Sequence, residues 1–276
     1  MNWEKYKIIS DHKGSKTKRS KINLPGLNNS MQNYLFIGGV ARSGTSALCE
    51  MLNCHPEIAM GMERYKSLAA NGELFSRAES LFVKEKFFDF EPCETNVPMV
   101  GGKYDELYRD MERKFQKVTY VGDKVPSYYK HVDRLMDSFP GAKIIIIWRA
   151  LVDVAMSWER RSKDTSSWPS INGMEAAAKE WSVAMDTIIQ ARENHRGSLV
   201  LLDYEDVFKV GNPIPKRLIN WLGLEMTEDY RRGIGGLRKK AQAIANNREN
   251  ASQEALDLAS QSKFIEVADK LKSISI

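Results

Sequence analysis

Hydrophobic and polar positions along this chain follow two different periods, which predicts a mixed α/β fold. Short apolar runs rich in Ile, Val, Leu and Tyr predict buried strands near residues 34–37, 58–60, 119–122, 144–148 and 199–202. Helical spacing of apolar residues predicts helices over 45–52, 151–161, 174–193 and 215–222. The run 144–148 is apolar at every position, as in a central strand that helices cover on both faces. We therefore expect three α/β/α layers around a mostly parallel sheet, with helical insertions.

The first 33 residues do not follow these patterns. Of the 41 Lys/Arg and 36 Asp/Glu in the chain, seven and two lie here, which leaves 34 of each sign elsewhere. Because the basic residues stand among Ser, Gly and Thr, this segment cannot bury a core. We expect a flexible basic arm at 1–33 and a single domain at 34–276. A solvated arm is favoured over contact with nucleic acid or a membrane, so no nucleic-acid partner is expected.

A long insertion, residues 64–117, separates the second and third predicted strands. It contains nine Phe and Tyr residues, and its ten basic and ten acidic residues cancel. The insertion should therefore offer shape and apolar surface to a bound molecule rather than an electric field. Trp158, Trp168 and Trp181 are further candidates for the walls of a pocket for such a molecule.

Composition also bounds the cellular context. The chain has no apolar run near the roughly 20 residues that span a bilayer, and its N-terminus has no apolar leader segment, so a cytoplasmic protein without a transmembrane segment is the expectation. Cys49, Cys54 and Cys93 are odd in number and lack metal-ligand spacing. They are interpreted as reduced, structural thiols.

The segment "GGVARSGTS", residues 38–46, nearly matches a phosphate-binding loop between a strand and a helix. Its glycines and the N–H groups of the following helix suit a phosphate or sulfate group. Thr45 stands where nucleoside triphosphate enzymes have a lysine that reaches the outer phosphates. Arg42 supplies a positive charge within the loop instead, which favours a donor with a single 5′ anionic group.

With these residues the chain resembles the sulfotransferases that use 3′-phosphoadenosine 5′-phosphosulfate (PAPS), in particular the tyrosylprotein and carbohydrate branch. In that family a motif [PA]-[RK]-S-G-T-[TS] cradles the 5′-phosphosulfate, and it stands here at 41–46. The continuation "MLNCHPEIAMGMERY" is also similar. The resemblance implies a P-loop type fold, with donor-binding residues Arg42, Ser43, Gly44, Thr45, Ser46 and Ala47.

A second motif, "KIIIIWRALVDVAMSWERR" at 143–161, lies where the family has its other donor contact. The resemblance implies that Arg149 and Ser157 bind the 3′-phosphate and that Arg161 assists. An arginine fork and a hydroxyl suit a terminal phosphate. Tyr204 matches a family tyrosine close to the adenosine, and the resemblance extends from about residue 34 to about residue 224.

The resemblance also implies the catalytic groups. Glu63 matches the glutamate base of the family's G-x-E segment, Lys124 matches a lysine that touches the transferring sulfate and the leaving oxygen, and Arg42 serves both binding and transition-state charge. The product would be 3′-phosphoadenosine 5′-phosphate (PAP), and no metal is expected. The structural alternatives are an acidic residue in the first turn of a helix that begins near Arg64, for Glu63, and a solvated loop lysine, for Lys124.

Two other functions stay open from the residues. A P-loop kinase or NTPase is one, because Asp203 follows an apolar strand as a Mg²⁺-holding aspartate would. The other is a non-catalytic nucleotide-binding module whose basic arm recruits a polyanion. The basic segment 231–240 is either a cover over the nucleotide or a solvated turn. The acceptor is left open among small molecules, carbohydrates and peptides, and the insertion 64–117 is expected on the acceptor side of the site. The oligomeric state is not predicted.

Overall fold

The computed structural model describes residues 32–95, 97, 101–163, 173–245 and 251–276, and the chain divides into units 1–30 and 31–276. Almost all of the predicted basic arm, up to residue 31, and Trp168 lie outside the described residues. The rest of this description concerns the second unit.

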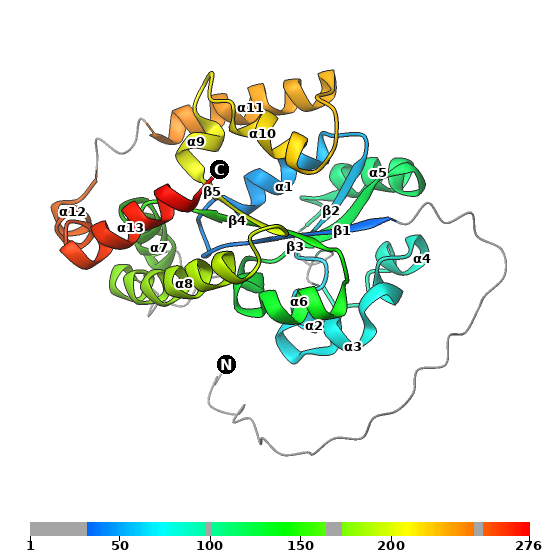
Figure 1. Cartoon of the computed structure of the whole chain (residues 1–276), viewed down its shortest axis with the longest axis horizontal. Coiled ribbons are helices and arrows are strands. Elements are labelled where there is room, and N and C mark those ends of the chain that lie inside the picture. The colour runs from blue at the N-terminus through cyan, green and yellow to red at the C-terminus, as the bar shows by residue number, and fades with distance from the viewer. Residues whose placement is uncertain (1–31, 96, 98–100, 164–172, 246–250) are drawn as a thin grey trace, which may run out of the picture. The chain divides into compact units, whose positions relative to one another are not determined.

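A sheet of five parallel strands forms the centre of this unit (Figure 1). The strands are β1 (Asn33–Gly38), β2 (Ile58–Met62), β3 (Tyr120–Lys124), β4 (Lys143–Trp148) and β5 (Leu199–Asp203), in the spatial order β2-β3-β1-β4-β5. Each strand lies at a predicted apolar run, and every strand pair is parallel. The carboxyl ends of all five strands therefore meet along one side of the sheet, the carboxyl edge.

Helices cover both faces of the sheet, which confirms the predicted α/β/α layers (Figure 1). One layer contains α1 (Thr45–Asn53), α9 (Tyr204–Phe208), α10 (Ile214–Trp221) and α11 (Glu228–Ala245). The other contains α2 (Lys66–Asn71), α3 (Glu73–Arg77), α4 (Lys84–Phe87), α6 (Val132–Ser138), α7 (Leu151–Lys163), α8 (Met174–Asn194), α12 (Gln253–Ala259) and α13 (Ser262–Ile274). Helix α5 (Asp105–Lys114) packs beside β2.

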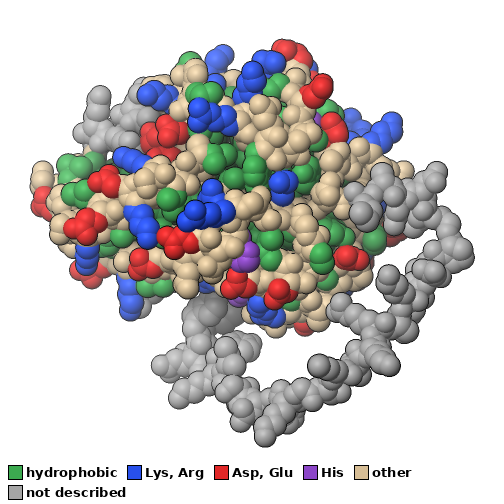
Figure 2. Space-filling view, viewed as in Figure 1, with side chains coloured by type: hydrophobic (Ala, Val, Ile, Leu, Met, Phe, Trp, Pro, Cys, Tyr) green, Lys and Arg blue, Asp and Glu red, His purple; other side chains and the backbone are tan. Residues whose placement is uncertain are grey.

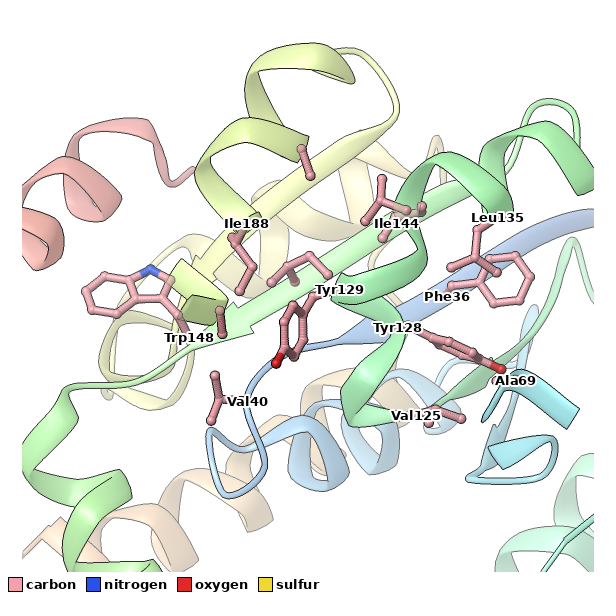
Figure 3. Packing of buried hydrophobic residues seen from close by; sticks show 14 of the residues in the cluster. Phe36, Val40, Ala69, Val125, Tyr128, Tyr129, Leu135, Ile144, Trp148 and Ile188 are labelled. Atoms are coloured by element: carbon pink, nitrogen blue, oxygen red, sulfur yellow. The ribbon is translucent and has the colours of Figure 1, made fainter. Parts of the chain in front are cut away.

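The period of two along each strand divides the core between the two layers. Along β4, Ile144 and Ile146 enter one buried cluster, whereas Ile145 and Ile147 enter the other. Figure 3 shows Ile144 in the first cluster with Phe36 and Leu135. An apolar strand such as β4 is therefore stabilised from both faces, which fixes the position of the residues that follow it.

The insertion 64–117 differs from its expected role as an apolar surface. It forms α2 to α5 with short 3₁₀ segments, and Phe82, Phe87 and Phe115 are at most 2% exposed. The rings of Phe87 and Phe115 pack with centroids 5.1 Å apart. The reason is that these rings pack over the β2–β3 side of the sheet and bury its apolar side chains, so they belong to the core.

Two further observations concern the surface. On the face seen in Figure 2, Lys/Arg and Asp/Glu side chains are interspersed, in keeping with the balanced charge counted outside the arm. Within the part of the chain that the structure describes, no helix combines the length and the apolar composition needed to cross a bilayer.

Candidate functional site

The carboxyl edge gathers most of the candidate residues in the order of the strands. Glu63 follows β2, Lys124 ends β3, the loop 39–44 follows β1, Arg149 follows β4 and Tyr204 follows β5. Neighbouring strands lie about 4.8 Å apart, so these side chains form a row. The helix after β1 and the helix after β3 cover opposite faces, so the end of β1 is a topological switch point, the place where open parallel sheets bind ligands.

The backbone of the loop is held open at its glycines. A Cβ on Gly39 would collide with the carbonyl oxygen of Ile147, and one on Gly44 would collide with the ring of Tyr204. Gly44 has a φ of 96° and precedes α1 without a side-chain cap, so no side chain within the described residues caps the first N–H groups of this helix. Such a glycine cradle at a helix N-terminus is suited to an anion.

Side chains from α7 and α8 fix this cradle and the residue after β4. The indole N–H of Trp158 donates to the carbonyl of Ala41 at 3.0 Å, and that of Trp181 donates to the carbonyl of Arg149 at 2.9 Å. Both tryptophan side chains are buried, so they position backbone rather than line an open pocket as expected. An indole N–H needs a partner when it is buried, and a backbone carbonyl is the nearest acceptor at each place.

Ser157 contacts Arg42 directly. The Arg42 Nε donates to Ser157 Oγ at 2.9 Å, although 115 residues separate them. Arg42 has a φ of 77°, a left-handed conformation that costs a non-glycine residue energy and that this contact helps to hold. Because Ser157 accepts this bond, its hydroxyl proton is left to donate to a bound group.

Arginines converge on this side of the carboxyl edge. Partial burial lowers the pKa of Arg42, and Arg161, Arg149 and Arg160 lower it further by like-charge repulsion. The guanidinium of Arg149 stacks 4.2 Å from the centre of the Tyr204 ring. The clustered positive charge makes an anion the favoured occupant.

Asp153 is the acidic side chain that pairs with this cluster. It forms an ion pair with Arg149, which comes just before α7: Arg149 Nε lies 3.5 Å from Asp153 Oδ2. That separation leaves Arg149 Nε without a hydrogen bond within the described residues.

Other polar atoms here also lack partners. Among the described residues, Ser43 Oγ and Arg161 Nε are buried without a hydrogen-bond partner, as is Arg149 Nε. Buried polar groups normally find partners. Two further atoms of this kind, Arg192 Nε and Arg238 Nε, lie elsewhere, on α8 and α11, whereas the three near the loop are atoms that a bound anion there could contact.

Glu63 and Lys124 form a closed group on the other side of the loop. The Lys124 Nζ donates to Glu63 Oε1 at 2.9 Å and to Ser46 Oγ at 3.1 Å, and Lys66 Nζ donates to Glu63 Oε2 at 3.0 Å. Lys124 is 1% exposed, so it is not a solvated loop lysine. Glu63 lies three residues before α2, so it is not in the first turn of that helix.

The electrostatics of Glu63 follow from this group. Burial alone would raise the pKa of its carboxyl, but the ammonium groups of Lys124 and Lys66 outweigh burial and lower the pKa. Glu63 is therefore ionised at neutral pH and can accept a proton, and the ammonium of Lys124 links it to the loop through Ser46.

Asp203 does not have the environment of a free metal ligand. Its carboxylate accepts the backbone N–H of Glu205 at 2.9 Å and caps α9, and burial raises its pKa to about 6. The segment 231–240, expected as a nucleotide cover or a solvated turn, lies within α11 and is therefore not a turn. Its Gly233 packs against the side chain of Cys54, a contact that any Cβ would obstruct.

Sequence reasoning missed one residue of this edge. Asp123 is fully buried directly before Lys124, and it accepts backbone N–H groups from the segment after Glu63. The sequence feature that could have indicated Asp123 is that it is an acidic residue inside the otherwise mostly apolar segment "YVGDKV". The Nε2 of His55, in the loop after α1, lies 2.8 Å from the carbonyl oxygen of Glu225.

Comparisons with known proteins agree with this arrangement. A model of the sulfotransferase family matches residues 35–229. Protein-tyrosine sulfotransferase 1 of Rattus norvegicus is 27% identical over 183 residues, which cover 64% of this chain and 45% of that protein. The same enzyme of Homo sapiens is 28% identical over 159 residues, which cover 56% and 41%.

The fold of a solved structure is also similar. The sulfotransferase domain from the curacin biosynthetic pathway has a TM-score of 0.50 and 17% identity, with 73% of this chain and 77% of that domain covered. This chain spans less than half the length of the curated relatives it matches. The family model covers most of the chain, including the loop, Glu63, Lys124 and Arg149. The chain belongs to the sulfotransferase family.

Proposed function

We propose that this protein transfers a sulfuryl group from PAPS to a hydroxyl or amine acceptor, with Glu63 as the base. The observation that carries the proposal is the row along the carboxyl edge. On one side of the loop stands the linked group Glu63–Lys124–Ser46, and on the other stand arginines with unpartnered N–H groups. A base beside one end of an anion site is the arrangement that sulfuryl transfer needs.

The residues present fit PAPS as the donor. The cradle at Gly39 and Gly44 and the unpartnered Ser43 Oγ suit the 5′-phosphosulfate, which the segment from Arg42 to Ala47 would hold. The 3′-phosphate would be held by Arg149, Ser157 and Arg161, two of which have a buried Nε without a hydrogen-bond partner within the described residues. Tyr204, which packs on both Gly44 and Arg149, would lie beside the nucleoside.

Each side chain then has a distinct role. PAPS supplies the sulfuryl group, whose bond to the 5′-phosphate oxygen breaks as a bond to the acceptor oxygen or nitrogen forms. Glu63 accepts the proton that the acceptor loses, and its low pKa keeps the carboxylate ionised before that step. Lys124 and Arg42 place positive charge where negative charge develops on the leaving phosphate.

The first acceptor class to test is suggested by the base together with the names of the relatives. A carboxylate assists a hydroxyl that must lose its proton, and the relatives are named protein-tyrosine sulfotransferases. We propose a phenolic hydroxyl, including that of a peptide tyrosine, as the first acceptor to test. Alcohols of sugars and small molecules are the comparison set.

A binding assay and a transfer assay test this function. We expect PAP to raise the melting temperature without Mg²⁺, because the arginines and the loop supply the positive charge. Stabilisation by ATP only in the presence of Mg²⁺ would favour the kinase or NTPase alternative, against which the capping role of Asp203 already speaks. Labelled PAPS offered with tyrosyl peptides, phenols, sugars and alcohols should give a labelled product.

Deletion of residues 1–30 addresses the non-catalytic alternative. An enzyme should keep PAP binding and transfer without this segment. Loss of every bound partner together with the segment, from a protein that never transfers sulfate, would support a binding module instead.

A further inference from the structure

Asp123 is a buried carboxylate with four donors. It is 0% exposed at the end of β3, where Oδ1 accepts the backbone N–H groups of Arg64 and Lys124, each at 2.9 Å. Its Oδ2 accepts the backbone N–H of Tyr65 at 2.9 Å and the hydroxyl of Tyr128 at 3.1 Å. Full burial and a full set of partners show that this carboxylate is built into the fold and does not face a ligand.

The donors belong to the two segments that carry the proposed chemistry. Arg64 and Tyr65 are the two residues that follow Glu63, and Lys124 follows Asp123 itself. One carboxylate therefore ties the turn of the base to the strand end of the ammonium. A further bond, from the Glu63 N–H to the Lys124 carbonyl at 2.8 Å, joins the same two segments.

The turn at Glu63 needs such restraint. Glu63 has a φ of 58°, in the left-handed region that a non-glycine residue adopts at a cost. Hydrogen bonds to the two N–H groups that follow hold this conformation against the extended alternatives. Without them the Glu63 carboxylate would lose the geometry that places it 2.9 Å from Lys124 Nζ.

Neighbouring residues are shaped around Asp123. A Cβ on Gly61 would lie 2.8 Å from Asp123 Oδ1 and 2.8 Å from the Arg64 Cβ, so this place in β2 accommodates only glycine. Tyr128 is fully buried, and its ring packs against Phe36 with centroids 5.6 Å apart, in the layer seen in Figure 3. The Tyr128 hydroxyl is thus fixed by packing and can orient the carboxylate.

We propose that Asp123 is the positioning residue of the reaction, because it holds the Glu63 turn and the Lys124 backbone together from behind. This inference rests on the proposed sulfotransferase function. Asp123 touches no substrate, so it acts through Glu63 and Lys124. Its loss should disturb transfer while the arginine side of the site, on β1, β4 and β5, still binds nucleotide.

Asp123→Asn is the decisive variant. The amide keeps the shape, but its NH₂ group faces N–H and O–H donors, so one side of the cluster loses its acceptor. We expect the rate of transfer from labelled PAPS to a tyrosyl peptide, or to water, to fall about 10- to 100-fold. The Kd of PAP should stay within about threefold, and the acid side of the pH profile should shift because the pairing of Glu63 with Lys124 changes.

Tyr128→Phe and Asp137→Asn complete the test. Tyr128→Phe removes one donor of four and should lower transfer about threefold with PAP binding unchanged. Asp137 is exposed on α6, and Asp137→Asn should behave as the wild type. If Asp123→Asn fails to fold, a Tyr128→Phe protein with an unaltered transfer rate overturns the proposal.

The outcomes separate the two proposals. An active wild type whose Asp123→Asn variant transfers at the same rate, or loses PAP affinity and transfer to the same degree, overturns the positioning role alone. A wild type that transfers no sulfuryl group to any acceptor or to water overturns both proposals.

Discussion

The two sides of the carboxyl edge differ in how their polar side chains are satisfied. On the β2–β3 side, Glu63, Lys124 and Asp123 find their partners within the protein. On the β1–β4 side, among the described residues, Ser43 Oγ and Arg149 Nε are buried without a hydrogen-bond partner. The first side is complete within the protein, whereas the second has polar atoms that, in the proposed function, a bound anion would contact.

This difference has an energetic reason. Clustered arginines repel one another, and buried N–H groups without acceptors cost free energy, so the β1–β4 side is held in a less stable state that a bound anion relieves. The β2–β3 side needs exact placement of a carboxylate and an ammonium, which a closed hydrogen-bond network provides. In the proposed function, binding and chemistry are thus supported by two different kinds of local structure.

Glu63→Gln should have the largest effect, because it removes the base from the completed side. We expect transfer to fall about 10²- to 10⁴-fold, the usual contribution of a positioned base, while the Kd of PAP stays within about threefold. The ligand-free protein should also melt several degrees lower, since Lys124, which is 1% exposed, loses its charged partner.

Steady-state kinetics, calorimetric PAP binding and thermal unfolding measure these three effects. Glu112→Gln, an exposed position on α5, is the matched control and should leave all three unchanged. Near-normal transfer by Glu63→Gln would rule out the assignment of the base.

Arg149→Ala tests the incomplete side and should give the opposite pattern. We expect the Kd of PAP to rise about 10- to 100-fold, because one or two charge-assisted hydrogen bonds are lost. The melting temperature without ligand should change by only about 3 °C, since relief of repulsion among the arginines offsets the lost contacts with Tyr204 and Asp153.

Isothermal titration with PAP and thermal unfolding without ligand provide the two measurements. Arg217→Ala, at an exposed position on α10, is the control. A strongly destabilised Arg149→Ala protein with normal PAP affinity would show that this side is structural and would remove the contrast.

The strands could be predicted because each is a continuous apolar run, which a doubly covered parallel strand requires. The row of residues could be anticipated only in part, since motifs name Glu63 and Arg149 but spatial order depends on strand pairing. The contact between Arg42 and Ser157 joins positions 115 residues apart, and no local pattern reports it. The role of Asp123 could not be predicted, because it depends on the N–H and O–H donors that the fold brings to its carboxylate.

Two segments show why local signals failed. The glycine-rich stretch 231–240 has low helix propensity, yet it lies within α11 because Gly233 allows close packing against Cys54. The rings of the insertion 64–117 gave no sign of whether they face solvent or core. Tertiary packing decided both cases.

Lys66→Met should have the smallest effect, and it sharpens the contrast by loosening the completed side. Lys66 pairs with Glu63 Oε2 but is 55% exposed, so solvent and salt weaken its influence. The lowered pKa of Glu63 means that its pairing stabilises the fold above the ordinary pKa of a glutamate and that this stabilisation is lost as pH falls through the lowered value. Removal of one ammonium should move the pKa of Glu63 up toward the ordinary value of 4.5, so the acid side of the rate profile should move to higher pH.

Transfer rates measured across this pH range at low and high salt should show that the shift becomes smaller as salt is added. The control variant Lys117→Met, which changes an exposed lysine, should show no shift. An unchanged rate profile would mean that Lys66 does not act on Glu63 as a charge, and Lys124 alone would then account for the lowered pKa of Glu63.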